Sequence, residues 1–321
     1  MRAARLVGPR RFEILSDAVT PAPKPGEVLV RMEHVSICGS DLLTYDRVLP
    51  EEQYPLRIGA PCHECFGTVE ESYDDNIKKG QKVVALSYTG GLVEYTTLPG
   101  NRCVPVPVDN IEDPSLWVLC QPVGTVIYAV QQMGSVLGKK VAILGQGPIG
   151  LAFTDLVSRA GASRVIVTDV VDHRLEVAKS IGATHTVNAA RENVIETINE
   201  LTGGGADVVV EACGLPETAN QVFNVLRVKG QAVIFGMPHG DPVFPFEWAV
   251  MYNRLPNIIV TNSARGGDIV PAVHTCVDLV GQGKLDMSYM VSHRLPLTDV
   301  GRAYELFSGR KENAVKVLIS I

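Results

Sequence analysis

Short apolar runs alternate with stretches of helical spacing through the second half of the chain. The runs are Val141–Leu144, Arg164–Asp169, Val208–Glu211, Gln231–Phe235 and Asn257–Asn262. Each is about as long as a buried strand, and the segments after the first three carry apolar positions at helical spacing. Strands that alternate with helices in this way predict a parallel sheet within an α/β fold.

The first 110 residues have a different pattern. Short strand-like segments there are broken by glycine and proline, including a proline-rich connector at residues 20–26, which predicts a mostly β structure. Helix-like stretches follow at 114–137 and 268–283. The closing segment 314–321 is too apolar for a free tail, and we expect it to return to the β-rich part. The predicted domains are therefore a discontinuous one of residues 1–120 and 266–321 and an inserted one of residues 121–265.

A glycine-rich turn joins the first apolar run to the helix after it, as Gly145-x-Gly147-x-x-Gly150. Gly145 permits a sharp turn, Gly147 lets a pyrophosphate approach the backbone, and Gly150 lets the helix pack close to the strand. The helix N-terminus attracts the phosphate charge. The same motif also occurs in ordinary glycine-rich turns. The candidate cofactor-binding residues at this turn are Gly145, Gly147, Pro148, Ile149 and Gly150.

An acidic residue, Asp169, ends the next apolar run at about the 20-residue spacing that dinucleotide-binding units show. A carboxylate there can accept both ribose hydroxyls of an adenosine and repels a 2′-phosphate, so NAD is expected rather than NADP. The alternative is that Asp169 only caps a turn or a helix. Strand, glycine turn and acid together predict a dinucleotide site.

The composition is that of an ordinary globular enzyme. The 321 residues are 46% hydrophobic and 20% charged, and the net charge of −6 comes without a basic run. The length predicts two domains, and the charge argues against nucleic acid or a membrane as partner. The N-terminus has no signal-like apolar core, and seven cysteines without a disulfide spacing fit a reducing compartment. We expect a cytoplasmic protein whose cysteines act as thiols or metal ligands.

Cys38, His63 and Cys120 form a second group of chemically active residues, in the β-rich part. Thiolate and imidazole are ligands that zinc prefers, and a catalytic zinc takes three protein ligands with one position open. The spacing does not show that the three residues meet, and a free cysteine often only fills space in a core. Glu64, next to His63, is a possible alternate or fourth ligand.

Two polar residues follow Cys38 closely. Ser40 is near enough to pass a proton from a metal-bound alcohol to solvent. Asp41 could orient His63, because a metal-bound imidazole usually donates its other N–H to an oxygen.

Several motifs, taken in order, carry a family resemblance. They are Ile37–Asp41, His63-Glu64 with Phe66–Val69, Gly145–Gly150, Asp169, Gly182-Ala183 and Val291–Leu297. Together they resemble the medium-chain, zinc-dependent alcohol dehydrogenases over essentially the whole chain, most closely the polyol (sorbitol-like) and threonine dehydrogenase branch. The resemblance implies NAD(P)-linked oxidation of an alcohol. It also implies a GroES-like catalytic domain with an inserted Rossmann domain, in agreement with the discontinuous layout.

The resemblance also implies roles for the matching residues. Cys38 and His63 become the first two zinc ligands, and Ser40 becomes the hydroxyl that passes the proton. Cys120 falls where alcohol dehydrogenases of this family place a third cysteine ligand. It is therefore the favoured third ligand, with Glu64 as its competitor.

On the cofactor side, the resemblance places Arg174 beside the adenine. Lys316 is a weaker candidate, since it could equally decorate an edge strand. Cys62 and Cys65 depart from the family pattern, and without a second cysteine pair they are interpreted as packing thiols rather than a zinc or redox motif. The lobe that holds a structural zinc in relatives is absent, so one catalytic zinc per chain is expected.

The function predicted from all this is a zinc-dependent dehydrogenase that transfers a hydride between a small secondary alcohol or polyol and NAD. Two alternatives stay open. One is a zinc-free NAD(P)H-dependent quinone or enoyl reductase of the same fold, which Asp169 and the Cys38/His63 pair oppose. The other is a non-catalytic dinucleotide-binding protein. The apolar strand 257–262 could pair across a two-fold axis, so a homodimer or homotetramer is expected.

Overall fold

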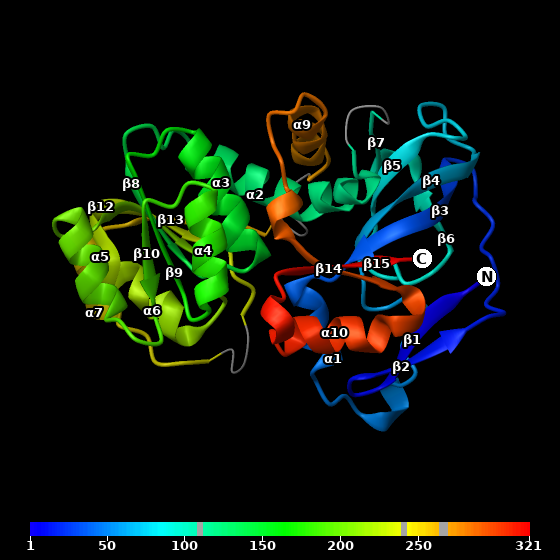
Figure 1. Cartoon of the computed structure of the whole chain (residues 1–321), viewed down its shortest axis with the longest axis horizontal. Helices are drawn as coiled ribbons and strands as arrows, with labels where there is room; N and C mark the ends of the chain where they lie inside the picture. The colour runs from blue at the N-terminus through cyan, green and yellow to red at the C-terminus, as the bar shows by residue number, and fades with distance from the viewer. Residues whose placement is uncertain (108–111, 239–242, 263–268) are drawn as a thin grey trace. The chain divides into compact units, whose positions relative to one another are not determined.

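A computed structural model of the chain describes residues 1–107, 112–238, 243–262 and 269–321 (Figure 1). The chain divides into two units, which we call the β-rich unit (Met1–Gly124 and Val270–Ile321) and the parallel-sheet unit (Thr125–Ile269). The domain boundary predicted at 120/121 precedes this division by a few residues, and the one predicted at 265/266 lies outside the described residues. None of the described helices is long and apolar enough to cross a membrane.

Buried apolar runs build the sheet of the parallel-sheet unit. Its strands are β8 (Lys140–Leu144), β9 (Arg164–Asp169), β10 (His185–Asn188), β11 (Ala206–Glu211), β12 (Leu226–Ile234) and β13 (Asn257–Val260). Neighbouring strands are all parallel, in the spatial order β10-β9-β8-β11-β12-β13. In chain order this is 3-2-1-4-5-6, which is the doubly wound Rossmann arrangement. The predicted α/β fold is confirmed, and β10 is an addition that no apolar run had indicated.

Helices pack on both faces of this sheet. They are α3 (Pro148–Arg159), α4 (Asp172–Ser180), α5 (Val194–Thr202), α6 (Pro216–Val225) and α7 (Trp248–Arg254). α3 and α4 contact each other and the strands β8 to β10. On the other face, α6 lies between α5 and α7 and contacts both. The central strands are buried on both faces, which explains why their sequences are continuous apolar runs rather than alternating ones.

The β-rich unit has mostly antiparallel strands. They are β1 (Ala3–Gly8), β2 (Arg11–Leu15), β3 (Glu27–Ser36), β4 (Glu64–Ser72), β5 (Lys82–Leu86), β6 (Tyr95–Pro99), β7 (Cys103–Pro105), β14 (Val291–Pro296) and β15 (Lys316–Ser320). The larger sheet has the order β14-β15-β3-β4-β5-β7, β6 also pairs with β3, and β1 and β2 form a separate hairpin. The C-terminal strand β15 therefore lies between β14 and the N-terminal strand β3, as the apolar closing segment had indicated.

Short helices complete the β-rich unit. The α-helices are α1 (Leu42–Tyr45), α2 (Cys120–Met133), which continues into the other unit, α9 (Val270–Gly281) and α10 (Val300–Ser308). The 3-10 helices are η1 (Gly39–Asp41), η2 (Glu51–Gln53), η3 (Gly100–Arg102), η4 (Pro114–Leu119), η5 (Ser288–Met290), η6 (Leu297–Asp299) and η7 (Lys311–Asn313). The helix predicted over 114–137 is thus η4 followed by α2. It ends before Gly134, whose left-handed φ of 68° suits a glycine after a helix.

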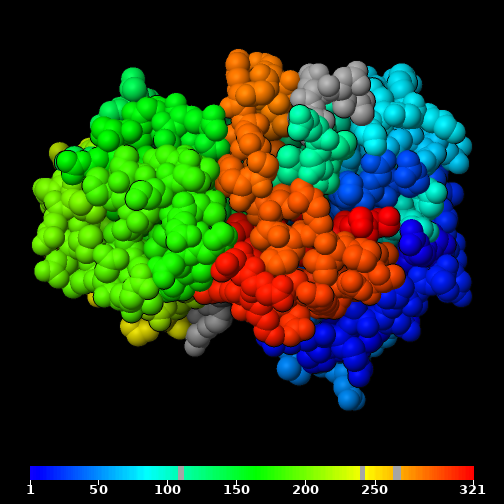
Figure 2. Space-filling model, viewed as in Figure 1, coloured from blue at the N-terminus to red at the C-terminus, as the bar shows by residue number. Residues whose placement is uncertain are grey.

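The helix α10 joins the two ends of the chain within this unit. Its residues Val300, Ala303, Tyr304 and Phe307 are buried at helical spacing, and they belong to one hydrophobic cluster with residues of β1, β3, β4 and β15. Figure 2 shows the orange and red C-terminal residues lying directly against the blue N-terminal ones. The C-terminal segment is therefore part of the core of the β-rich unit.

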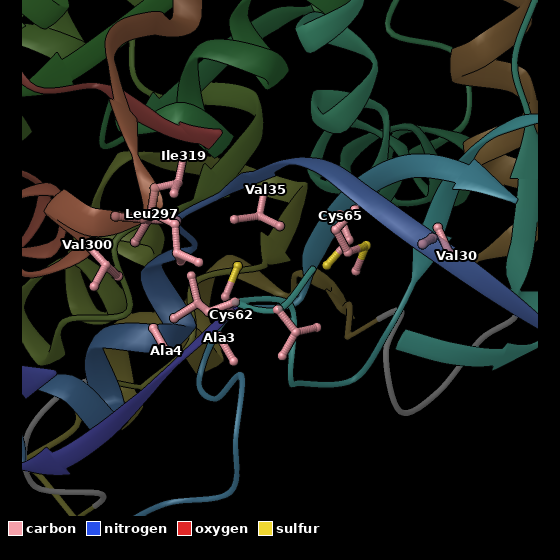
Figure 3. Packing of buried hydrophobic residues seen from close by; sticks show 14 of the residues in the cluster. Ala3, Ala4, Val30, Val35, Cys62, Cys65, Leu297, Val300 and Ile319 are labelled. Atoms are coloured by element: carbon pink, nitrogen blue, oxygen red, sulfur yellow. The ribbon is translucent and has the colours of Figure 1, made fainter. Parts of the chain in front are cut away.

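Cys62 and Cys65 lie inside that same hydrophobic cluster (Figure 3). Both side chains are fully buried, and the pKa of Cys62 is raised well above its usual value, chiefly by burial. A protonated buried thiol behaves as a small hydrophobic group. Their position agrees with the interpretation as packing thiols.

Candidate metal centre and dinucleotide site

The pairing of β3 with β4 brings the candidate metal ligands together. Cys38 follows the end of β3 and has an extended backbone at the start of η1. Glu64 begins β4 and lies opposite Ser36 in the antiparallel register, and His63 directly precedes it. The register therefore places Cys38 beside His63, although the two are far apart in the sequence.

Within the described part of the chain, Cys38, His63 and Glu64 are grouped as a possible metal site. One ligand atom from each, namely a sulfur, a ring nitrogen and a carboxylate oxygen, lies within 4.8 Å of the other two. Glu64 is buried, whereas Cys38 and His63 are partly exposed. Thiolate, imidazole and carboxylate are the donor types found in zinc sites, so these residues fit a zinc ion.

Asp41 holds the imidazole of His63. Its Oδ1 lies 3.1 Å from His63 Nδ1, and its side chain is only 1% exposed. A hydrogen bond from Nδ1–H to this carboxylate leaves Nε2 as the nitrogen that can bind a cation. Burial alone would lower the pKa of His63, but Cys38 and Asp41 raise it well above its usual value. A cation at Nε2 must therefore displace a proton.

Glu64 is held by a buried cation. Lys316 Nζ lies 2.6 Å from one carboxylate oxygen of Glu64 and 2.8 Å from the other, and Ser36 donates its hydroxyl to the same carboxylate. Burial alone would lower the pKa of Lys316, but Glu64 raises it above its usual value, so the ammonium stays charged. Lys316 lies in β15, which has a neighbour on each side. The edge-strand interpretation of Lys316 is therefore wrong.

The structure does not bring Cys120 to the group of Cys38, His63 and Glu64. Cys120 begins α2 and is fully buried, and its thiol interacts with that of Cys276 in α9. The two helices approach closely here, because a Cβ on Gly124 would lie 2.6 Å from the side chain of Val273. Burial and Cys276 raise the pKa of Cys120 well above its usual value. In this arrangement Cys120 is a protonated packing thiol.

Ser40 has a buried hydroxyl without a hydrogen-bond partner among the described residues. It lies in η1, between Cys38 and Asp41. Leaving a buried hydroxyl unpaired costs roughly 1–3 kcal/mol. A hydrogen bond to a bound ligand would remove this cost.

The predicted glycine turn has the geometry of a dinucleotide site. Gly145, after β8, has a left-handed φ of 95°. A Cβ on Gly150 would lie 1.9 Å from the carbonyl oxygen of Gly145, so only glycine lets α3 start this close to the strand. A Cβ on Gly147 would meet nothing within 4 Å. Pro148 and Ile149 form the first turn of α3, whose N-terminus favours an anion.

Asp169 lies next to this turn, at the end of β9. Its Oδ2 accepts a 2.7 Å hydrogen bond from the backbone N–H of Gln146, and its Oδ1 accepts one of 2.9 Å from Val171. Arg174 in α4 is almost buried, and its Nη1 lies 3.9 Å from Asp169 Oδ2. The structure therefore gathers the glycine turn, Asp169 and Arg174 at one end of the parallel sheet.

The sequence reasoning missed Ser36 and Tyr304 as supports of the candidate metal centre, and it named Lys316 only as a weak cofactor contact or an edge-strand residue. Ser36 and Lys316 contact Glu64, and Tyr304 donates its hydroxyl to Asp41. A lysine within an otherwise apolar strand is a signal that could have indicated the buried acidic partner of Lys316. For Tyr304 there is no such signal, because an aromatic residue on the apolar face of a helix usually only fills a core.

Comparison with known proteins agrees with this geometry. A family model described as "Alcohol dehydrogenase GroES-like domain" matches residues 24–108, and one described as "Zinc-binding dehydrogenase" matches residues 148–279. An L-threonine 3-dehydrogenase of Bacillus velezensis is 27% identical, covering 95% of this chain and 94% of its own. Among solved structures, the alcohol dehydrogenase TADH of Thermus sp. ATN1 has a TM-score of 0.87 at 25% identity, with 100% of both chains covered. A putative zinc-binding dehydrogenase of Sinorhizobium meliloti 1021 bound to NADP has a TM-score of 0.84 at 26% identity, covering 100% of this chain and 99% of its own.

Proposed function

Because the chain belongs to the zinc-dependent alcohol dehydrogenases of the medium-chain family, we propose that it binds one zinc ion and oxidises a small secondary alcohol or polyol with NAD. Membership of the family makes it an oxidoreductase of the dehydrogenase class. The observation that carries the proposal is the convergence of ligand atoms from Cys38, His63 and Glu64 within 4.8 Å.

We place Glu64, rather than Cys120, as the third zinc ligand. Its carboxylate already lies at the centre, whereas Cys120 is engaged with Cys276. Three protein ligands leave one position for a substrate oxygen, as catalytic zinc sites require. The partial exposure of Cys38 and His63 supports an opening toward the substrate.

Each residue of the centre then has a task. Zinc supplies, when bound, a Lewis acid that lowers the pKa of a substrate hydroxyl, and NAD supplies the hydride acceptor. Ser40 accepts the proton of that hydroxyl and passes it toward solvent. Asp41 fixes the ring of His63, while Lys316 and Ser36 fix the carboxylate of Glu64.

NAD is proposed as the cofactor because of Asp169. Its carboxylate is oriented by two backbone N–H groups next to the glycine turn, where it can bind the ribose hydroxyls and repel a 2′-phosphate. Arg174 is the opposing feature, since a guanidinium nearby can accept a 2′-phosphate. The ratio of kcat/KM for NAD to that for NADP decides between them, and a ratio below one would reject this choice.

The metal site is tested by the zinc content of protein purified without added metal. We expect about one zinc per chain in the wild type and in Cys120→Ser, and far less in Cys38→Ser. The two variants remove the same atom type, so the comparison controls for the loss of a thiol. Equal loss in both variants would restore Cys120 as a ligand. No zinc in the wild type would favour the zinc-free reductase or the non-catalytic binding protein.

A homodimer through β13 is also proposed. Among the described strands β13 pairs with β12 alone, and Ile258 and Val260 are 42% and 74% exposed. Trp248 and Tyr252 of α7 are exposed in the same unit, and apolar surface of this kind marks interfaces. Light scattering should give twice the chain mass of 34.6 kDa, or four times for a tetramer, and a monomer for Val260→Lys. A wild-type monomer would reject the proposal.

The cytoplasm is the proposed location. None of the seven cysteines, all of which lie among the described residues, forms a disulfide in the structure, which is expected in a reducing compartment. Partial labelling of native protein by a thiol reagent, and full labelling after unfolding without reductant, would support it. A disulfide in freshly isolated protein would count against it.

A further inference from the structure

Asp41 links two of the candidate metal ligands. Its Oδ1 faces His63 Nδ1 at 3.1 Å, and its Oδ2 accepts the backbone N–H of Cys38 at 3.0 Å. The same Oδ2 accepts a second hydrogen bond, from the hydroxyl of Tyr304 at 3.3 Å. One carboxylate thus holds the chain at one ligand and the ring of another. Of these three partners, only Tyr304 comes from outside the segments that carry the ligands.

The ring of Tyr304 is fixed in place. Tyr304 is fully buried on α10, with its ring centroid 4.9 Å from that of Phe12 and 5.0 Å from that of Tyr45. Burial, together with the charge of Asp41, raises the pKa of Tyr304 well above its usual value. The hydroxyl therefore stays protonated and can donate to the carboxylate of Asp41.

We propose that Tyr304 is a positioning residue for the metal centre, acting on His63 and Cys38 through the carboxylate of Asp41. This inference rests on the proposed function, because it assumes that these residues hold zinc. Without the Tyr304 hydroxyl, Oδ2 keeps only the backbone donor of Cys38, and the carboxylate is held less firmly in its orientation. The ring of His63, which this carboxylate orients, is then also held less firmly. Removing the partners of metal ligands typically weakens metal binding about 10- to 100-fold.

A purely structural role predicts something different. The hydroxyl would then only satisfy Asp41 inside the core, and its removal would lower stability without changing how the metal is held. Tyr45 offers a matched control. Its ring lies in the same aromatic group, and none of the hydrogen bonds found at the Asp41 carboxylate comes from its hydroxyl. Tyr45→Phe removes the same atom from the same cluster.

The experiment measures zinc release from the holoprotein into an excess of a chromophoric chelator. We expect release about tenfold faster for Tyr304→Phe and unchanged for Tyr45→Phe. In the background Asp41→Ala, adding Tyr304→Phe should change the rate less than twofold, because two residues that act in series are not additive. An unchanged rate for Tyr304→Phe, or an equal effect with and without Asp41, would overturn the inference.

The outcomes also separate this inference from the proposed function. A wild type without about one zinc per chain refutes the proposed function, whereas a zinc-loaded Tyr304→Phe with wild-type release refutes only the positioning role. If Tyr304→Phe does not fold, 3-fluorotyrosine at position 304 keeps the ring and makes the hydroxyl a stronger donor. Zinc release should then be slower than in the wild type, and an unchanged or faster rate would reject the role of this hydrogen bond.

Discussion

Two alanine substitutions in the glycine turn should separate folding from cofactor binding. In Gly150→Ala the new Cβ would lie 1.9 Å from the carbonyl oxygen of Gly145 and 2.8 Å from its carbonyl carbon. Reaching even 3.0 Å from the oxygen needs a shift of about 1.1 Å (3.0 − 1.9) between β8 and α3. Both contact atoms are backbone, so no side chain can turn away to relieve them.

Overpacking of this kind costs roughly 1–3 kcal/mol. For a unit of this size, that lowers Tm by roughly 2–12 °C. Gly147→Ala is the matched control. Its backbone is extended, with φ −66° and ψ −178°, which alanine adopts freely, and its Cβ would meet nothing within 4 Å. We expect its stability to change by less than about 0.5 kcal/mol.

For cofactor binding we expect the reverse: Gly147→Ala, which leaves stability unchanged, should weaken the binding of NAD. The methyl group of Gly147→Ala would occupy the side from which the pyrophosphate approaches the backbone. If this methyl group also costs roughly 1–3 kcal/mol, but in the free energy of binding, the Kd for NAD rises roughly 5- to 150-fold. Differential scanning calorimetry and calorimetric titration with NAD measure the two quantities. Wild-type Tm in Gly150→Ala, or wild-type Kd in a folded Gly147→Ala, would refute the reasoning.

Three further changes test other parts of the molecule. Ser40→Ala should lower kcat about 100-fold while zinc content stays at the wild-type level, and an unchanged kcat would remove Ser40 from the proton path. Lys316→Met leaves the buried carboxylate of Glu64 without its cation, so urea unfolding should show a loss of about 3–5 kcal/mol, and a loss below 1 kcal/mol would contradict the pairing. Burial alone would raise the pKa of Asp207, but hydrogen bonds from the backbone of Lys140 and from Arg227 outweigh it and lower this pKa. The ionised carboxylate of Asp207 therefore stabilises the folded state above the unfolded pKa of about 3.9, and this stabilisation is lost as the pH falls through the folded pKa. Asp207→Asn should make the free energy of unfolding depend less on pH on the acid side. An unchanged pH dependence would show that Asp207 does not contribute.

The sheet of the parallel-sheet unit was predictable because its signal is local. Val141–Leu144 is a continuous apolar run, and a strand buried on both faces needs one. The Rossmann strand order could be expected from the glycine turn and Asp169, since these fix which strand comes first and which lies beside it. β10 was not predictable, because only the end of this four-residue strand is buried and its sequence has no apolar run.

The candidate metal centre was only partly predictable, because it depends on contacts between distant elements. Cys38, His63 and Glu64 could be proposed from residue type, and the β3–β4 register decides that they meet. The same kind of reasoning could not place Cys120, whose side chain is directed by the close packing of α2 on α9. A helix turned by one residue would present a different side chain to the centre, and sequence spacing does not fix that rotation.

The layout of the β-rich unit has a chemical consequence. The candidate ligands Cys38, His63 and Glu64 lie in the N-terminal part of this unit, whereas Lys316 and Tyr304, which hold Glu64 and Asp41, come from its C-terminal part. The two carboxylates are stabilised by different means. Glu64 has a buried ammonium, so its charge is compensated whether or not a metal is present.

Asp41, in contrast, makes no salt bridge to a lysine or arginine among the described residues, and it is held by hydrogen bonds from Cys38 and Tyr304 and by the imidazole of His63. A carboxylate held in this way can share its charge with the ring it orients, which strengthens that ring as a metal ligand. The chain must therefore fold its last strand β15 and helix α10 onto β3 and β4 before the centre is complete. A nascent chain that lacks β15 and α10 has all three candidate ligands but neither of these supports, so we expect tight metal binding only after the C-terminal segment has docked.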